Sequence, residues 1–260
     1  MKPIPTIAPD WPAPARVRAL FTTRAGGVST GRWGAAHEAG GLNLGARCGD
    51  EPGRVARNRQ LLAAEVGRPI RWLEQVHGAR VVEVMAAAGD DDPVAAPATA
   101  DAQVTRARDV ALGVLVADCL PVLFADRVGD MVAVAHAGWR GLAAGVLENT
   151  IALMRSRGSG VDLIAWLGPC IGPTAFEVGD DVRAAFASQD PRAAAHFRPG
   201  ARPGKWWADL PALAVERLQG MGVAAIHRSN ACTVSDSDRY WSYRRDGECG
   251  RMAGVIWLQD

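Results

Sequence analysis

The clearest pattern in the chain is a set of continuous apolar runs in its middle. Val110 to Val116 is apolar throughout and leads into Ala117-Asp118-Cys119, and Met131 to Ala135 leads directly into His136. Runs that are apolar on both faces are typical of strands buried in a sheet that helices cover. We therefore predict buried strands at these two places and in two further runs, Val161 to Leu167 and Val255 to Leu258.

Helical stretches are interleaved with these runs, although not regularly. They are predicted from about Leu142 to Met154, from Val182 to Ala187 and from Pro211 to Leu218. Irregular interleaving favours mixed sheets over a doubly wound parallel sheet. Ala86 to Ala102, rich in Ala, Asp and Pro, is predicted to be a surface loop, and Gln189 to Gly204 is irregular. Neither is long enough to separate two domains, so we expect one catalytic domain over residues 1–260.

Composition and charge argue against several classes of partner. The chain has 29 Lys and Arg against 28 Asp and Glu, so no overall field attracts nucleic acid or an anionic membrane. No apolar stretch reaches the roughly 18 residues that span a bilayer, and Met1 to Trp11 lacks the apolar core of a signal peptide. Five cysteines without an export signal favour reduced thiols in the cytoplasm. We expect a cytoplasmic enzyme, monomeric or a small homo-oligomer.

Three residues with metal-ligand chemistry lie near the predicted strands. Cys119 and His136 are 17 positions apart, the length of one strand, a turn and a second strand, so their side chains can converge at strand ends. His77 lies in Gln75-Val76-His77-Gly78, just before the strand-like Val81 to Val84. One thiolate and two imidazoles match a zinc site with an open position, where a metal lowers the pKa of water to about 7. The alternative is a buried structural cysteine with hydrogen-bonded histidines.

Short motifs along the chain are more specific than this spacing. They include Thr22-Thr23-Arg24-Ala25-Gly26-Gly27-Val28-Ser29, Leu42-Asn43-Leu44-Gly45, Asn58-Arg59, Ala117-Asp118-Cys119-Leu120-Pro121, Ala135-His136-Ala137-Gly138-Trp139-Arg140-Gly141, Gly168-Pro169-Cys170-Ile171-Gly172, Phe176-Glu177-Val178-Gly179 and Ser242-Tyr243-Arg244-Arg245-Asp246-Gly247. Together they resemble the YfiH family, labelled laccase domain or multicopper polyphenol oxidase, from about Phe21 to Leu258. Its members are interpreted as purine nucleoside phosphorylases with adenosine deaminase activity.

The resemblance implies a fold, a reaction and a set of site residues. The fold is α+β, an α-β-β-α sandwich with mixed sheets, similar to the catalytic domain of cytotoxic necrotizing factor toxins. The reactions are phosphorolysis of adenosine, inosine, guanosine and methylthioadenosine, and deamination of adenosine. The resemblance implies that His77, Cys119 and His136 bind zinc and are catalytic, that Arg59 contacts substrate or phosphate, and that Asn43 lines the pocket. Residues 32–41 are longer than the usual link in the family; if this insertion folds over the site, it would alter the substrate range but not the metal chemistry.

Two other enzyme classes and one binding function stay open. A multicopper oxidase needs about ten histidines, mostly in His-x-His pairs, whereas this chain has five and no such pair. Polyphenol oxidase activity would therefore require adventitious copper at a single site. Cys119 with His77 or His136 could instead act without metal as an amide hydrolase on a peptide or cell-wall precursor. The third possibility is a metal-dependent binding or assembly protein.

Several further residues are assigned to less certain roles. Asp118 is adjacent to Cys119 and could shuttle protons or cap a turn. Cys170 is the strongest candidate for a fourth metal ligand, and we predict that it is not one, because a closed site has no Lewis acidity to offer. Backbone N–H groups at residues 138–141 could hold phosphate. Other candidates for binding an anion, which could equally be structural, are Arg24, Arg244, Arg245 and Arg251.

Overall fold

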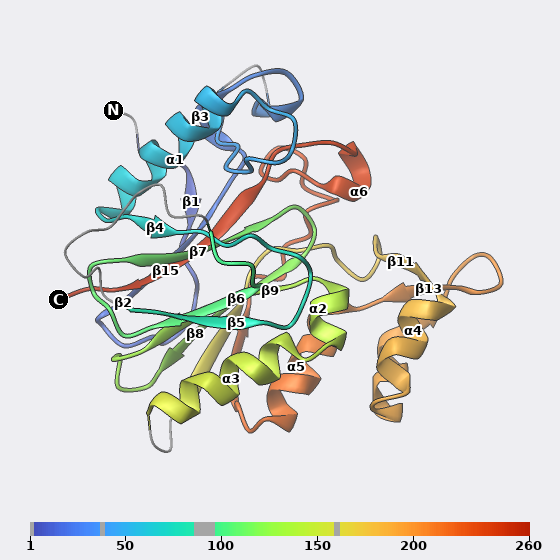
Figure 1. The fold of residues 1–260 in the computed structure, drawn as a ribbon. Coiled ribbons are helices and arrows are strands. Elements are labelled where there is room, and N and C mark those ends of the chain that lie inside the picture. The colour runs from blue at the N-terminus through green and yellow to red at the C-terminus, as the bar shows by residue number, and fades with distance from the viewer. Residues whose placement is uncertain (1–2, 37–39, 86–96, 159–161) are drawn as a thin grey trace.

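The computed structural model describes residues 3–36, 40–85, 97–158 and 162–260, and it contains two stacked sheets between outer helices (Figure 1). The five-stranded sheet has the order β1 (Thr6–Ile7), β2 (Val17–Thr22), β15 (Met252–Leu258), β7 (Ala111–Val116), β4 (Ile70–Arg71). The six-stranded sheet has the order β14 (Ala225–Arg228), β10 (Leu163–Leu167), β8 (Leu120–Asp126), β9 (Val132–Ala137), β6 (Ala102–Thr105), β5 (Val81–Val84). Both sheets are mixed, because β4–β7, β5–β6 and β10–β14 pair in parallel and the other pairs are antiparallel.

The remaining elements surround these sheets. The helices are α1 (Pro52–Val66), α2 (Trp139–Ala143), α3 (Val146–Arg157), α4 (Asp180–Ala187), α5 (Leu210–Gly220) and α6 (Tyr243–Asp246), with 3-10 turns η1 (Gly31–Trp33) and η3 (Pro191–His196). A three-stranded sheet has the order β11 (Glu177–Gly179), β13 (Lys205–Ala208), β12 (Phe197–Pro199), and β3 (Ala25–Ser29) lies beside α1. No helix in the described residues is long and apolar enough to cross a membrane.

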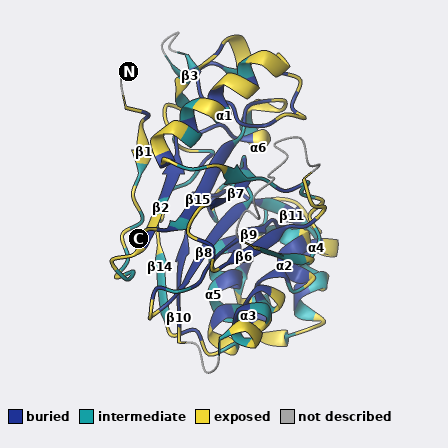
Figure 2. Cartoon of the chain, turned by 60° about the vertical axis from the view of Figure 1, so that its left-hand side comes forward, coloured by how far each residue is buried: buried dark blue, intermediate teal, exposed yellow. Residues whose placement is uncertain are grey.

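Alternating side chains divide the core into three layers. Along β7, Ala111 and Leu115 pack toward α1, whereas Leu112 and Val114 pack between the sheets. Along β9, Val132 and Val134 face the other sheet, whereas Ala133 and Ala135 face α3 and its neighbours. The central strands β8, β9 and β10 are therefore buried along their whole length, whereas the edge strands β1 and β14 and the outer faces of the helices are more exposed (Figure 2). The predicted α-β-β-α sandwich with mixed sheets is confirmed, while the similarity to the toxin domain stays a prediction.

The predicted elements are found, with informative shifts. The four apolar runs form β7, β9, β10 and β15. His136 lies inside β9 rather than after it. The single helix predicted from Leu142 to Met154 is two helices, α2 and α3, because Gly145 adopts a left-handed conformation (φ 91°) that breaks the hydrogen-bonded spiral. The irregular segment 189–204 contains η3 and β12. Of the loop predicted over 86–102, residues 86–96 lie outside the described residues, and Ala102 already begins β6.

Candidate active site

The β8–β9 hairpin brings Cys119 and His136 together. Its antiparallel register pairs Pro121 with His136 and Leu120 with Ala137, so Cys119, directly before β8, lies next to the end of β9. His77 approaches from the loop before β5, with its Nε2 3.8 Å from the Cys119 Sγ and its ring centroid 4.8 Å from that of His136. The potential ligand atoms of the three residues lie within 4.8 Å of one another, close enough to hold a metal ion.

A buried carboxylate, Asp101, positions both histidines. Its two oxygens accept the backbone N–H groups of Val76 (3.1 Å), His77 (2.9 Å) and Gly78 (2.8 Å), which fixes the loop in which His77 has a φ of 59°. Sequence analysis missed Asp101. The only available signal was an aspartate directly before a strand, which equally well describes a residue that caps a turn.

Asp101 also determines which nitrogen of His136 faces the cluster. Its Oδ1 lies 2.8 Å from His136 Nδ1, and both side chains are buried. A carboxylate that accepts from Nδ1 keeps the proton there, which leaves Nε2 as a lone pair for a metal. Burial alone would raise the pKa of Asp101, but hydrogen bonds from His136 and Gly78 hold it below its ordinary value, so the carboxylate stays charged.

The thiol and the imidazole perturb each other strongly. Burial acts to raise the pKa of Cys119, yet its attraction to His136 and hydrogen bonds from both histidines lower it to about 6. Burial acts to lower the pKa of His136, but the Cys119 charge and the Asp101 hydrogen bond raise it to about 9. In the absence of metal, Cys119 is therefore a thiolate at neutral pH. One thiolate and two imidazoles form a donor set that suits zinc or copper.

Close packing of a glycine against the ligands completes the centre. A Cβ added at Gly138 would lie 2.9 Å from the Cys119 Sγ and 3.1 Å from the His77 ring, too close for any other residue without displacing a ligand. Residues 138–141 form the start of α2, which has only five residues. We therefore assign this glycine-rich turn to packing, and the binding of phosphate by its backbone stays a prediction.

The three ligands open into a cavity of about 700 Å³. Its walls carry aromatic and basic side chains contributed by distant parts of the chain, namely Trp72, Trp139, Phe176, Tyr243, Arg47, Arg59, Arg140, Arg244 and Arg251. Arg47 is paired with Glu74 (2.6 Å). In the part of the chain that the structure describes, the other four guanidinium groups have no carboxylate partner. The cavity thus offers flat apolar surfaces and excess positive charge beside the potential metal site.

Of the two predicted substrate contacts, Arg59 lines the cavity and Asn43 does not. Arg59 donates from Nε to the Leu44 carbonyl (3.0 Å), its guanidinium lies 5.1 Å from the Trp72 ring, and burial lowers its pKa. Asn43 is fully buried. It donates to Asp50 (2.9 Å) and accepts from the backbone of Gly45 and Arg251. The roles of both residues in substrate binding stay predictions. Asn43 could affect the cavity only indirectly, by holding the loop that carries cavity residues 45–48.

The other candidates are held by protein groups or lie outside the cavity. Both carboxylate oxygens of Asp118 accept hydrogen bonds, which supports the interpretation as a capping residue. Cys170 lies outside the ligand group, with its buried thiol near the Ile171 carbonyl (3.6 Å). Arg24 and Arg245 donate to backbone carbonyls and are not among the described cavity residues.

Comparison with known proteins fits this geometry. A family model described as multi-copper polyphenol oxidoreductase laccase matches residues 18–259. The chain is 48% identical to a purine nucleoside phosphorylase of Pseudomonas aeruginosa over 98% of both chains. It is 44% identical to the purine nucleoside phosphorylase YfiH of Escherichia coli, over 97% of this chain and 98% of that one. The chain belongs to the YfiH family. The resemblance predicted from the motifs is therefore confirmed.

Solved structures of the family share the whole fold. A crystal structure from Neisseria meningitidis, of a protein assigned to family DUF152, superposes with a TM-score of 0.88 at 46% identity, covering 98% of this chain and 99% of that one. YlmD of Geobacillus stearothermophilus superposes with a TM-score of 0.85 at 31% identity, covering 99% of both. The laccase label of the family model points to copper, yet a single group of potential ligands is present among the described residues.

Proposed function

We propose that this chain is a metal-dependent purine nucleoside enzyme. It would phosphorolyse adenosine, inosine, guanosine and methylthioadenosine, and deaminate adenosine. The observation that carries the proposal is an open group of three ligands, His77, Cys119 and His136, at the wall of a cavity rich in aromatic and unpaired basic side chains. The names of the relatives, purine nucleoside phosphorylases at 44% and 48% identity, support the same reaction.

Each part of the substrate has a matching surface in the cavity. A purine base stacks on aromatic rings, which this cavity presents from several directions. Phosphate carries about two negative charges at neutral pH. Arg59 keeps its two terminal nitrogens free of protein partners among the described residues, and we propose that they grip the phosphate. The burial that disfavours the charged form of Arg59 makes a bound anion more stabilising there.

The metal site gives the cavity its reactive end. His77, Cys119 and His136 would hold the ion, and Asp101 keeps His136 in the tautomer that can do so. A zinc ion with three protein ligands supplies Lewis acidity at its fourth position. We propose zinc rather than copper, because thiolate and imidazole ligands satisfy its tetrahedral preference without redox chemistry. We also propose that Cys170 is not a ligand, since its thiol lies outside the group.

Product analysis with and without phosphate tests the proposal directly. Chains of measured metal content are incubated with adenosine, and the products are separated by chromatography. Phosphorolysis gives adenine and ribose 1-phosphate only when phosphate is present. Deamination releases ammonia in both conditions and gives inosine, which phosphate would convert further to hypoxanthine and ribose 1-phosphate. His77→Ala and Cys119→Ala should lose metal and both reactions while remaining folded, because the ligands face the cavity. If zinc-loaded chain converts none of the nucleosides named above, the proposal is wrong.

A metal-free amide hydrolase is the second candidate, and one observation favours it. Cys119 has a pKa of about 6 and lies 3.8 Å from His77 Nε2, which is an arrangement suited to a nucleophile and its base. Its substrate would be a cell-wall peptide precursor. Zinc bound to the Cys119 thiolate would then block the nucleophile. A chelator should therefore activate the chain if it is a hydrolase and inactivate it if it is a metalloenzyme.

Three broader properties complete the proposal. All five cysteines are free, which supports a reducing compartment, and we propose the cytoplasm. Residues 1–260 would form one catalytic domain, because the metal ligands and the cavity walls come from both sheets and the loops between them. The chain would act as a monomer or small homo-oligomer, with purine nucleosides and phosphate as its small-molecule partners.

A further inference from the structure

Helix α6 forms part of the cavity wall and presents an exposed aromatic ring there. Tyr243, its first residue, lines the cavity and is 61% exposed. The guanidinium of Arg251 lies 5.9 Å from its ring centroid. Arg244, the next residue, also lines the cavity and reaches the Glu177 carbonyl (3.0 Å). An uncovered ring beside a cavity is suited to stacking on a flat ligand.

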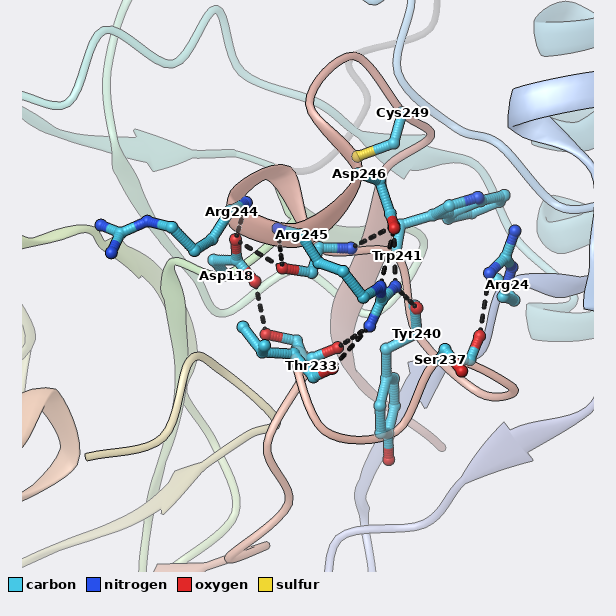
Figure 3. A network of polar contacts seen from close by, with 12 residues as sticks. Arg24, Asp118, Thr233, Ser237, Tyr240, Trp241, Arg244, Arg245, Asp246 and Cys249 are labelled. Carbon is cyan, nitrogen blue, oxygen red and sulfur yellow. Dashed lines mark hydrogen bonds and ion pairs between the residues drawn. The ribbon is translucent and has the colours of Figure 1, made fainter. Parts of the chain in front are cut away.

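A single carboxylate, Asp118, fastens this helix to the metal-ligand loop. Its Oδ2 accepts from the Ser242 hydroxyl (3.0 Å) and from the Arg244 backbone N–H (2.7 Å), and its Oδ1 accepts from the Thr233 hydroxyl (2.6 Å). Figure 3 shows Asp118 between Thr233 and Arg244. Asp118 is buried and has a φ of 90°, which is unusual for a residue other than glycine. The next residue along the chain is the candidate ligand Cys119. Asp118, which accepts hydrogen bonds from α6, is therefore only one peptide bond away from the candidate metal site.

The rest of the network consists of hydrogen bonds within α6 and from α6 to the segment before it. Ser242 caps the helix by accepting from the Arg245 N–H (3.1 Å). Arg245 in turn binds both oxygens of Asp246 (2.7 Å each) and the carbonyls of Thr233, Val234 and Tyr240 (2.8 Å each). A short helix of four residues has little stability of its own. The position of α6 therefore depends on these hydrogen bonds. The bonds that Asp118 accepts are those that connect α6 to the loop carrying Cys119.

We propose that Asp118 is a positioning residue that holds Tyr243 at a fixed place relative to Cys119, and that Tyr243 stacks on the purine base. The inference rests on the proposed function, whose substrates carry such a base. It separates two parts of the site: the three ligands and Asp101 hold the metal, and Asp118 and α6 hold the base. Substitutions in the second part should therefore change nucleoside binding without changing metal binding.

A matched pair of aspartate variants tests the positioning role. Asp126, at the opposite end of β8, is also buried and also accepts three hydrogen bonds, all of them from its own turn. Asp118→Ala and Asp126→Ala should lose similar thermal stability, whereas only Asp118→Ala should weaken nucleoside binding, by roughly tenfold to a hundredfold. Asp118→Asn should restore much of the binding, because its amide oxygen can accept the two Oδ2 bonds and the Thr233 hydroxyl can turn to accept from its nitrogen.

The measurements are calorimetric titration of zinc-loaded chain with inosine in phosphate-free buffer, where neither proposed reaction consumes it, together with zinc content, and KM and kcat for phosphorolysis. We expect KM to rise much more than kcat falls in Asp118→Ala, with zinc content unchanged. Loss of zinc in Asp118→Ala would instead assign Asp118 to the metal site and overturn the proposal. Equal weakening of nucleoside binding by the two alanine variants would assign the effect to general loss of stability and would also overturn the proposal.

Surface variants at Tyr243 keep the proposal testable if Asp118→Ala does not fold. Tyr243→Ala should weaken nucleoside binding about fivefold to a hundredfold, the range measured for loss of a stacking ring, and Tyr243→Phe should bind like the natural chain. Val128→Ala is the control, because Val128 is 72% exposed and lies in the β8–β9 turn, remote from the site along both strands. If the natural chain binds inosine and Tyr243→Ala binds it equally well, the inference fails. If the natural chain binds no purine nucleoside, the proposed function itself fails.

Discussion

Replacing Asp101 by asparagine should damage the metal site much more than an isosteric change normally does. Each oxygen of this carboxylate accepts two hydrogen bonds: Oδ1 from the His77 N–H and the His136 ring, and Oδ2 from the N–H groups of Val76 and Gly78. Whichever way the asparagine amide turns, its NH₂ group faces two donors. If the NH₂ group is turned toward His136, it would donate to Nδ1 and favour the tautomer with the proton on Nε2. In that tautomer Nε2 has no lone pair to offer a metal.

The expected magnitude follows from the number of bonds that cannot form. Two donors lose their acceptor, and a buried polar group without a partner costs about 1–3 kcal/mol. Because the backbone donors of this loop are only partly buried, we expect the metal-free chain to lose about 2–4 kcal/mol of unfolding free energy. Zinc affinity should fall by about tenfold to a hundredfold, as found when the hydrogen-bond partner of a metal-bound histidine is removed.

Urea unfolding of the metal-free chain and competition with a chelator for zinc measure the two effects. Asp126→Asn is the matched control: its Oδ1 alone accepts all three bonds, so an asparagine oxygen can replace it, and the loss should stay within about 1 kcal/mol. Equal zinc affinity in Asp101→Asn and the natural chain would refute the argument, because it would mean that the loop and His136 are held by something other than this carboxylate.

Three further outcomes are expected. Gly138→Ala should lower zinc affinity in the chelator competition, because its Cβ would lie 2.9 Å from the Cys119 Sγ; unchanged affinity would show that the turn shifts freely. Arg59→Ala should reduce phosphorolysis about 30-fold or more, measured as kcat/KM, and deamination much less; equal losses would place Arg59 on the nucleoside. In metal-free chain, the rate at which iodoacetamide alkylates Cys119, followed by peptide mass spectrometry, should rise with pH around its pKa of about 6 and then level off, because only the thiolate reacts. His136→Ala should move that rise to higher pH, and a natural chain that reacts only near the pKa of a free thiol, about 8.5, would contradict the thiolate assignment.

The layers of the fold and the candidate metal ligands could be predicted from the sequence. Runs apolar on both faces can only be buried on both faces, so β7 and β9 were predictable as strands between other layers. Cys119 and His136 were also predictable as neighbours, because they flank a hairpin whose length is readable from the chain. The family motifs added His77, which spacing alone does not connect to the other two. One predicted helix is divided where Gly145 adopts a conformation that the apolar period does not reveal, and helix α1 was not predicted.

How the candidate ligands are held, and what surrounds them, could be learned only from the folded structure. Asp101 and Asp118 both follow apolar or small residues near a strand, and in sequence each resembles an aspartate that caps a turn. Their roles depend on donors far away along the chain, such as Ser242, which is 124 residues from Asp118. Candidate arginines likewise divided into those that line the cavity and those, such as Arg245, that lie outside it and are held by backbone carbonyls. Hydrogen bonds form between groups that the fold brings together, and local sequence patterns record the strands and turns of that fold but not these partners.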